Sequence, residues 1–354
     1  MTTYAFWNNK SGVGKSYLTF QVASEYAKTH SNQPVLVIDL CPQANASSML
    51  LGGMGPGDQN LDQLCNQAPR KTISGYMESR ILSPYINPAT GGTFLIQASQ
   101  YNKNIPENLF LLPGDEQLEM QSSRVLNAAA PGPTDAWRMV HIWISDLIED
   151  VKKVWNQKNI TVFIDCNPSF SIYTELALSA SDGLIIPFSA DGSSKRAVRA
   201  VLALLYGITR VPGNQQSPFY LHSQQSRLQI PKIYFYVGNR LTQFKQSAQA
   251  FRTVVREIGN EIWSVWQNNP NVFFVHPPGQ GSPATRSAFN HMFQFEINDA
   301  NTASVVSSSL GIPLTTLAAG KHVIPGAATP SIVNQSQLDK LQPNIRDFVT
   351  SIMP

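Results

Sequence analysis

Residues 8–16 read Asn-Asn-Lys-Ser-Gly-Val-Gly-Lys-Ser, between a short apolar run at residues 4–7 and an amphipathic run that begins at Tyr17. Glycine adopts backbone conformations that other residues resist, so Gly12 and Gly14 let main-chain N–H groups approach an anion closely. The N-terminus of the following helix adds a partial positive charge. A strand, a glycine-rich loop and a helix in this order indicate a phosphate-binding loop rather than an ordinary glycine turn.

Two side chains of this stretch suit a nucleotide and its metal ion. Lys15 is placed to reach the β- and γ-phosphates, and the Ser16 hydroxyl to hold Mg²⁺. Where the usual pattern has its first glycine the chain has Asn9, and a second lysine, Lys10, follows it. This loop resembles the deviant Walker A motif of the ParA/MinD ATPases, Lys-(Gly or Ser)-Gly-Val-Gly-Lys-(Ser or Thr). The resemblance implies that Lys10 reaches across a dimer to the partner's nucleotide.

The resemblance also implies which positions bind ATP. In the loop and the first helical turn they are Lys10, Ser11, Gly12, Val13, Gly14, Lys15, Ser16 and Tyr17.

The residues beyond the loop indicate the fold class. Apolar positions at helical spacing over residues 17–30 precede the continuous apolar run 35–38, which gives a strand–helix–strand unit. Because near-continuous apolar strands belong to covered parallel sheets, we expect an α/β fold, a mostly parallel twisted sheet with helices on both faces.

The second predicted strand ends in polar residues at the sheet edge where α/β proteins bind ligands. ParA-like proteins carry Asp-x-Asp-Pro-Gln-Gly-Asn at this place, and the positions that match are Asp39, Pro42, Gln43 and Asn45. Ala44 replaces a glycine, and Cys41 replaces the second aspartate, which the family uses to orient and activate the attacking water. A thiol does not supply a carboxylate's charge at neutral pH unless its pKa is strongly lowered. Cys41 is thus either a catalytic position with weak hydrolysis or a small buried residue, and Asp39 is the alternative base.

An apolar strand at residues 160–165 delivers a second carboxylate, Asp165, to the same edge. The segment resembles the Walker B motif, with Asn167 where the family's first of two prolines stands. By this resemblance Mg²⁺ is held by Ser16 and Asp165, with Asp39 as a second contributor. Oxygen ligands of this kind are those that Mg²⁺ prefers.

Residues 52–134 are longer than the connection usual in the family. We expect one ParA-like domain over residues 1–354, with an insertion or extended connection around 52–134. Within it the pattern predicts a short helix at 60–65 and strands at 92–97 and 108–113. An apolar face over residues 135–155 then predicts one long helix, capped by Thr134 or Asp135.

Further buried strands are expected at 184–188 and 232–237, with a helix at 195–208 between them and another from residue 244 to 258. A final amphipathic helix, interrupted at Pro343, closes the chain. The strand at 232–237 leads to Asn239 and Arg240, where related proteins place an asparagine that reads the adenine edge. The helices after the strands at 184–188 and 232–237 carry cations that are candidates for contacts with DNA. The alternative is that these cations only lie on solvated helix faces. They are Lys195, Arg196, Arg199, Lys245, Arg252 and Arg256.

Composition narrows the class of protein. Charged residues are 14% of the 354 residues, below the roughly 25% of soluble proteins, and the net charge of +3 permits a polyanionic partner without requiring one. The three cysteines, Cys41, Cys65 and Cys166, lack metal-site spacing and favour reduced thiols. No signal-peptide pattern and no apolar run of membrane-spanning length occurs. We expect a cytoplasmic protein without stable membrane association.

By resemblance, the function is that of a ParA-like switch. ATP with Mg²⁺ is sandwiched in a homodimer that binds DNA without sequence preference, associates with the nucleoid, and positions plasmid, chromosome or large cargo with a small adaptor or centromere-binding protein. The alternative is a hydrolysis-deficient module, clamped by ATP on DNA or a scaffold. A membrane-binding MinD-type ATPase fits less well, because the last helix has only Lys340 and Arg346. The chain lacks the tyrosines that a tyrosine kinase of this type needs, because no tyrosine follows Tyr236. It also lacks the paired cysteines of a reductase related to the nitrogenase iron protein.

Overall fold

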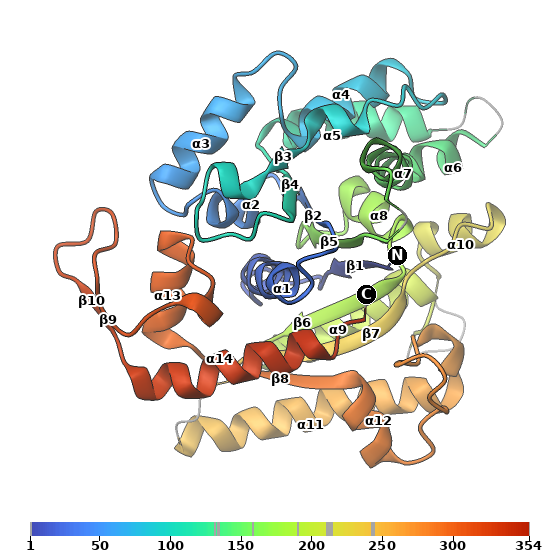
Figure 1. Cartoon of the computed structure of the whole chain (residues 1–354). Helices are drawn as coiled ribbons and strands as arrows, with labels where there is room; N and C mark the ends of the chain where they lie inside the picture. Colours follow the sequence, from blue (N-terminus) through green and yellow to red (C-terminus); the bar gives the residue numbers. More distant parts are fainter. Residues whose placement is uncertain are drawn as a thin grey trace.

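The computed structural model describes residues 2–130, 132, 135–157, 159–189, 191–209, 215–241 and 245–353, without the side chains at 240–241 and 245–251. Its centre is an eight-stranded sheet in the order β3-β4-β2-β5-β1-β6-β7-β8 (Figure 1). Within this sheet every strand pair is parallel except β3–β4. The strands are β1 (Thr2–Phe6), β2 (Val35–Leu40), β3 (Ile96–Gln97), β4 (Leu109–Leu112), β5 (Thr161–Cys166), β6 (Gly183–Phe188), β7 (Lys232–Leu241) and β8 (Gln294–Asn298).

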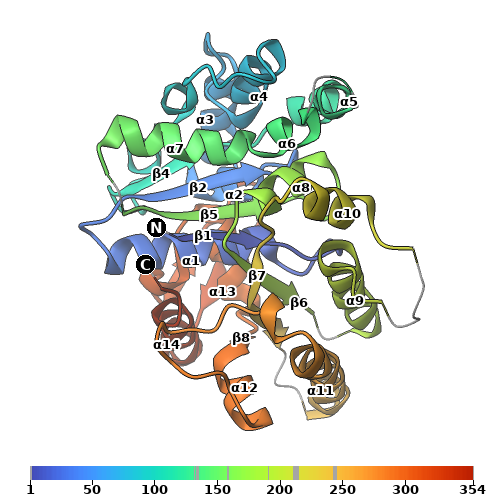
Figure 2. The ribbon, with the colours of Figure 1, turned by 90° about the vertical axis from the view of Figure 1, so that its right-hand side faces the viewer.

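Helices cover both faces of this sheet, as the turned view makes plain (Figure 2). One face packs against α1 (Lys15–Thr29), α2 (Asn45–Leu50), α13 (Asn301–Leu310) and α14 (Gln335–Thr350). The other packs against α4 (Ile73–Leu82), α5 (Gln117–Ala129), α6 (Ala136–His141), α7 (Trp143–Trp155), α8 (Ile172–Ser179), α9 (Gly192–Tyr206), α11 (Lys245–Asn268) and α12 (Arg286–Phe293). Alternate residues of one strand serve the two cores: Val35 and Val37 face the first, Leu36 and Ile38 the second. The expected doubly covered α/β sheet is confirmed.

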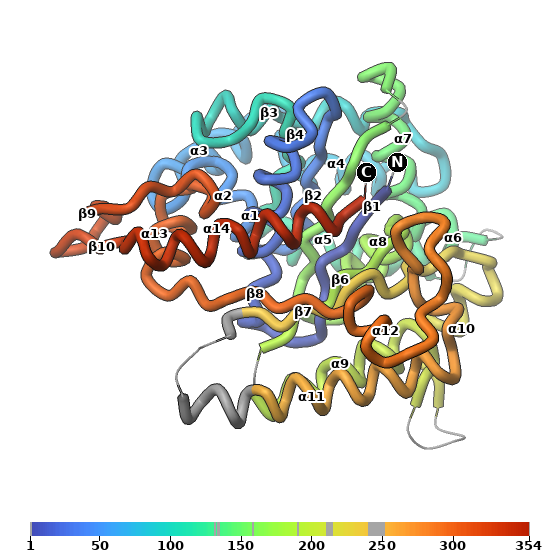
Figure 3. Tube along the Cα trace, turned by 60° about the horizontal axis from the view of Figure 1, so that its bottom comes forward, coloured from blue at the N-terminus to red at the C-terminus, as the bar shows by residue number. Residues whose placement is uncertain are grey.

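The remaining elements lie at the edges. They are α3 (Pro56–Cys65), α10 (Pro218–Gln225), short 3₁₀ turns, and a hairpin of β9 (Gly320–His322) and β10 (Ser331–Val333) that projects beside α13. Helix α14 runs from this hairpin back across the molecule to the start of β1 (Figure 3). There the Tyr4 hydroxyl donates to the Met353 carbonyl at 3.0 Å. The two ends of the described chain are therefore tied together at one side of the sheet.

The region 52–134 contributes to the main sheet. Its strand β4 pairs with β2 and extends the parallel sheet, as expected for residues 108–113. The strand expected at 92–97 is wrong over its first half, because residues Gly91–Phe94 form a 3₁₀ turn and only Ile96–Gln97 pair. Gly91 lies against α7, where an added Cβ would stand 3.1 Å from the Leu147 carbonyl oxygen. This close approach places the turn against α7, and the strand begins only after the turn, at Ile96.

Two helices differ from their expected form. The single helix expected over 135–155 is divided into α6 and α7 at Ile142, whose φ of −91° and ψ of 3° leave the helical register. The break buries Trp143, whose indole N–H donates to the Pro84 carbonyl at 2.9 Å. Asp135 begins α6 in a left-handed conformation without a side-chain cap, and Thr134 lies outside the described residues. Conversely, α14 is continuous through Pro343, because Leu341 and Ile345 are buried on either side of it.

Candidate functional site

The loop of residues 8–16 joins β1 to α1, as its sequence predicts. Gly12 and Gly14 have φ of 75° and 83°, and Gly14 is the residue that precedes the first turn of α1. Left-handed backbone of this kind turns successive N–H groups toward one side, which forms an anion-binding concavity. An added Cβ at Gly12 would meet no atom within 4 Å, so the loop is open on its outer side. Phosphate groups fit this position at the N-terminus of α1.

Lys15 is folded back over the loop. Its ammonium donates to the main-chain oxygens of Lys10 at 2.7 Å and Asn8 at 3.3 Å, and the side chain is almost fully buried. Burial lowers the pKa of Lys15, while Asp165 and the two nearby cysteines act to raise it. Carbonyl oxygens are weaker partners for an ammonium than phosphate oxygens, since both members of the latter pair are charged. The arrangement suits transfer of this ammonium to a phosphate.

Asp165 is the second-last residue of β5, behind the loop, and is completely buried. Among the described residues, neither of its carboxylate oxygens accepts a hydrogen bond, although the Ser16 and Thr19 hydroxyls lie close enough to lower its pKa. Burial above all, and then Asp39, raise that pKa well above the usual range. A buried carboxylate without a partner is costly unless a cation completes it. Ser16 and Asp165 are therefore a donor set that fits Mg²⁺.

Asp39 holds the following loop together. One carboxylate oxygen accepts from the Cys41 N–H at 3.1 Å, and the other accepts from the Ser47 N–H at 3.0 Å and the Ser47 hydroxyl at 2.7 Å. Burial raises the pKa of Asp39 to about 6, against the effect of these three bonds. Both oxygens are thus engaged with the segment 41–47. A role of Asp39 at the metal or at the water stays a prediction, and the observed bonds show that Asp39 also positions the segment 41–47.

Cys41 stands at the same edge and is almost fully buried. Burial, with the nearby Asp39 and Asp165 carboxylates, raises the pKa of its thiol to about 12. The thiol is therefore neutral near pH 7 and does not replace the charge of a carboxylate. Ala44, which replaces the family's glycine, has a φ of 50°, a conformation that glycine adopts without strain.

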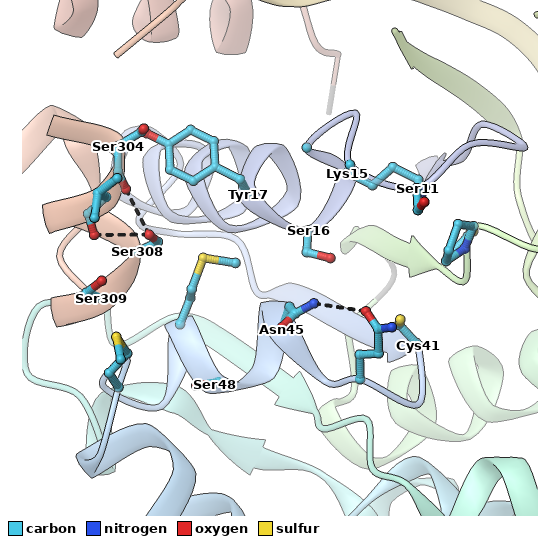
Figure 4. A pocket seen from close by; sticks show the side chains of 18 residues that line it. Ser11, Lys15, Ser16, Tyr17, Cys41, Asn45, Ser48, Ser304, Ser308 and Ser309 are labelled. Carbon is cyan, nitrogen blue, oxygen red and sulfur yellow. Dashed lines mark hydrogen bonds between the residues drawn. The ribbon is translucent and has the colours of Figure 1, made fainter. Parts of the chain in front are cut away.

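A pocket of 430 Å³ opens beside the loop (Figure 4). One wall comprises the loop, Cys41, Gln43 and Asn45, and the opposite wall is helix α13 with Ser304, Val305 and Ser308. In Figure 4, Tyr17 points toward Ser304 and Ser308, away from Cys41. The sequence did not single out α13, whose Ser-rich residues 304–309 carry no motif. Met54 closes the same wall, because its N–H donates to the Ser309 carbonyl at 2.8 Å.

Lys10 points away from Lys15 to the start of α9. Its ammonium forms an ion pair with Asp191 and donates to the hydroxyls of Ser189 at 3.1 Å and Ser194 at 3.3 Å. Asp191 also caps α9 by accepting from the Ser193 N–H at 3.0 Å. An aspartate followed by Gly-Ser-Ser before an apolar stripe is an N-cap signal, which predicts a helix start at residue 192 rather than 195.

The predicted adenine-binding and DNA-binding residues differ in their surroundings. Asn239 is buried and donates to the Val13 carbonyl at 2.8 Å, so it ties β7 to the phosphate loop. Lys195 and Arg199 pair with Glu257 and Glu261 of α11, each at 2.8 Å. Arg196, Arg252 and Arg256 are exposed, and none of them forms an ion pair within the part of the chain that the structure describes. The side chains of Arg240 and Lys245 lie outside the described residues.

Comparison with known proteins identifies the family. A family model described as AAA domain matches residues 1–217, which contain the phosphate loop, Asp39 and Asp165. The chain belongs to this AAA-domain family. The resemblance to ParA/MinD-like P-loop ATPases that residues 8–16 carry is thereby confirmed.

Solved structures share the fold of this AAA-domain chain at low sequence identity. Apo McdA from Cyanothece has a TM-score of 0.53 and 15% identity, covering 88% of this chain and 91% of that one. The ATP complex of a McdA variant from Cyanothece has the same score and identity over 100% of this chain and 98% of that one. The pnob8 ParA structure has a TM-score of 0.50 and 14% identity, covering 83% and 80%.

Two sequence relatives match part of the chain. Two uncharacterized proteins from Pseudomonas putida are each 29% identical over 196 residues, which is 53% of this chain. The match spans 56% of the length of those relatives. In the described part of the chain, no helix combines the length and apolar character needed to cross a membrane.

Proposed function

We propose that this chain is a ParA-like positioning ATPase, an ATP-dependent switch that dimerises around its nucleotide. The observation that carries the proposal is the buried Asp165 carboxylate, which accepts no hydrogen bond from the described residues and lies directly behind a phosphate loop that contains Lys15. A lysine at the loop and a carboxylate at the neighbouring strand end are the two charges that a nucleoside triphosphate with its metal requires. That a McdA variant of the same fold was solved as an ATP complex supports ATP as the nucleotide.

In this proposal each residue has one task. Ser16 and Asp165 would hold Mg²⁺, which neutralises charge on the phosphate oxygens when bound. The Lys15 ammonium would leave the main-chain oxygens of Asn8 and Lys10 and bind the phosphates. Asp39 fixes the segment 41–47, and Asn239 fixes the loop backbone at Val13. The chemistry then depends on electrostatic positioning of the phosphates by these charges.

The same proposal gives Lys10 its role in the dimer. Lys10 is not needed by its own phosphate loop, because Lys15 already serves the phosphates there. It would reach the nucleotide of a second subunit, as the first lysine of this motif does in the ParA/MinD family. ATP would then be enclosed between two copies of the chain. The dimer would bind DNA without sequence preference, associate with the nucleoid and move cargo with an adaptor protein.

A second function is favoured by Cys41. A neutral thiol at the place of the family's water-activating aspartate supports an ATP-clamped module that binds DNA or a scaffold and hydrolyses very slowly. The two functions share ATP binding and dimerisation and differ in turnover. Single-turnover hydrolysis, with and without a candidate adaptor, separates them.

The test of the shared part is nucleotide-dependent assembly. Light scattering on the full chain with ATP and Mg²⁺ should give twice the mass found with ADP or without nucleotide, and EDTA should abolish the increase. GTP serves as the matched control nucleotide. A chain that binds no ATP by calorimetry, or that has the same mass in all conditions, would contradict the proposal.

A further inference from the structure

The segment between β2 and α2 carries the position at which the family holds the attacking water. Asp39 has both oxygens engaged by Cys41 and Ser47, and Cys41 is a buried thiol. Neither side chain offers a free polar group to the pocket in the way that a second carboxylate would. Hydrolysis by this chain would then draw on another side chain of the pocket wall to hold the water.

Gln43 is a polar side chain of this wall. It is exposed and lines the pocket together with the phosphate loop and Lys15. Its carbonyl oxygen accepts from the Asn45 side-chain amide at 3.4 Å, the bond drawn at Asn45 in Figure 4. A carboxamide has two acceptor sites on oxygen and two N–H donors. The Asn45 bond uses one acceptor site, which leaves the second site and the NH₂ group available to a ligand of the pocket that Gln43 lines.

The backbone that carries Gln43 is held in place. The residues that flank it are linked, because the Ala44 N–H donates to the Cys41 carbonyl at 3.0 Å, and Ala44 itself is left-handed. From behind, Gly114 approaches so closely that an added Cβ would stand 2.7 Å from the Cys41 carbonyl oxygen. The Ser47 hydroxyl accepts from the Gly114 N–H at 2.9 Å and bridges it to Asp39. The loop cannot withdraw from the pocket without breaking these contacts.

We infer that Gln43 orients the attacking water in this chain, steadied by Asn45, in place of the missing carboxylate at position 41. A glutamine serves in this way in other phosphate-loop enzymes, where it aligns a water without acting as a base. The inference rests on the proposed ATPase function. It assigns a catalytic residue to the segment that Asp39 and Ser47 hold in position.

The step balances without a protein base. The water oxygen forms a bond to the γ-phosphorus while the bond from that phosphorus to the bridging oxygen breaks. The electron pair of the broken bond stays on the bridging oxygen, which becomes part of the β-phosphate of ADP. The Gln43 carbonyl oxygen accepts a hydrogen bond from the water, and the NH₂ group donates to a phosphate oxygen. The water proton passes to a γ-phosphate oxygen, so the products are ADP and inorganic phosphate.

The test compares Gln43→Ala with the parent chain in single-turnover ATP hydrolysis, with ATP affinity measured by calorimetry. The hydrolysis rate should fall about 10²-fold, because water-orienting and proton-handling groups contribute at least this much. The affinity should change by less than about 2-fold, since the ground state keeps Lys15 and the metal ligands. Gln59→Ala is the matched control, because Gln59 is an exposed glutamine of α3 that does not line the pocket.

Gln43→Glu keeps an acceptor oxygen at the same position and should be about 10-fold faster than Gln43→Ala. An unchanged rate in Gln43→Ala, equal losses in Gln43→Ala and Gln59→Ala, or a parent that binds ATP without hydrolysing it would overturn the inference. None of these results affects ATP binding by the parent. Loss of ATP binding in the parent would instead contradict the proposed function itself.

Discussion

Lys10 of the phosphate loop forms an ion pair with Asp191 at the start of α9, within one chain. Burial would raise the pKa of Asp191, but the hydrogen bonds from Lys10, Ser193 and Ser189 hold it below its usual range. The lysine that the family sends to a partner subunit is thus bound inside its own subunit. Dimerisation in the proposed manner must first separate Lys10 from Asp191.

The first prediction concerns this pair. Lys10→Ala should bind ATP nearly as well as the parent but lose the ATP-dependent dimer, because Lys15 still serves the phosphates of its own loop. Asp191→Asn keeps an N-cap acceptor for α9 and removes the charge that holds Lys10, so it should dimerise at several-fold lower ATP concentration. Light scattering against ATP concentration measures both effects, and Lys103→Ala, an exposed lysine, is the control. Normal dimerisation of Lys10→Ala would contradict the cross-subunit role.

The second prediction concerns Lys15. Lys15→Ala should weaken ATP binding about 10- to 100-fold, because a hydrogen bond to a charged group contributes about 1.5–3 kcal/mol. Lys28→Ala removes an exposed lysine from the same helix and should leave the affinity unchanged. Calorimetric titration with ATP and Mg²⁺ gives both values. Equal affinities for the two variants would remove the loop from the nucleotide site.

The third prediction concerns Cys41. Cys41→Asp should raise the single-turnover hydrolysis rate by about 10² or more while ATP affinity stays similar, because it restores a carboxylate beside the pocket. The parent should be slow, since the thiol is neutral near pH 7. Cys65→Asp, at a cysteine outside the pocket, is the control. Brisk hydrolysis by the parent with no gain in Cys41→Asp would show that the carboxylate is not limiting.

The fourth prediction concerns DNA. Arg252→Ala with Arg256→Ala should weaken binding to all sequences alike and reduce the log–log salt slope by about 0.9 for each phosphate that the variant no longer neutralises. Lys195→Ala with Arg199→Ala should have a smaller effect on the slope, because those cations are paired with Glu257 and Glu261. Fluorescence anisotropy with two unrelated duplexes at several salt concentrations compares the pairs. A slope that none of the four substitutions changes would favour a protein scaffold over DNA.

The fifth prediction concerns pH. Burial raises the pKa of Asp39 from 3.8 to about 6, so the folded chain binds this proton more readily than the unfolded chain. Through this group, the free energy of unfolding increases as pH falls from 6 to 4, by about 2 kcal/mol. Asp165 acts in the same direction, because burial raises its pKa as well.

Asp39→Asn should therefore reduce the increase in unfolding free energy between pH 6 and pH 4, measured by urea unfolding without nucleotide or metal. Asp62→Asn, at an exposed aspartate of α3, is the control and should keep the parent's pH dependence. The same slope in parent and Asp39→Asn would mean that Asp39 is ionised alike in the folded and unfolded chains.

Three features follow from the amino-acid pattern alone: the phosphate loop, the strands that lead to Asp39 and Asp165, and the sheet covered on both faces. These features are local: two glycines between a strand and a helix, and apolar runs that end in a carboxylate, require the same backbone wherever they occur. Parallel strands also bring their carboxyl ends to one edge of the sheet. Asp39 and Asp165 accordingly lie opposite each other in the register of β2 and β5.

The contacts of each polar group at that edge, in contrast, become visible in the folded chain. Asp39 bonds to Ser47, Lys10 to Asp191, and α13 closes a pocket with a segment from the first part of the chain. Such contacts depend on the packing of helices over the sheet, which no spacing in the sequence records. The physical reason is that a hydrogen bond needs its partner at about 3 Å, a condition that the folded chain alone imposes.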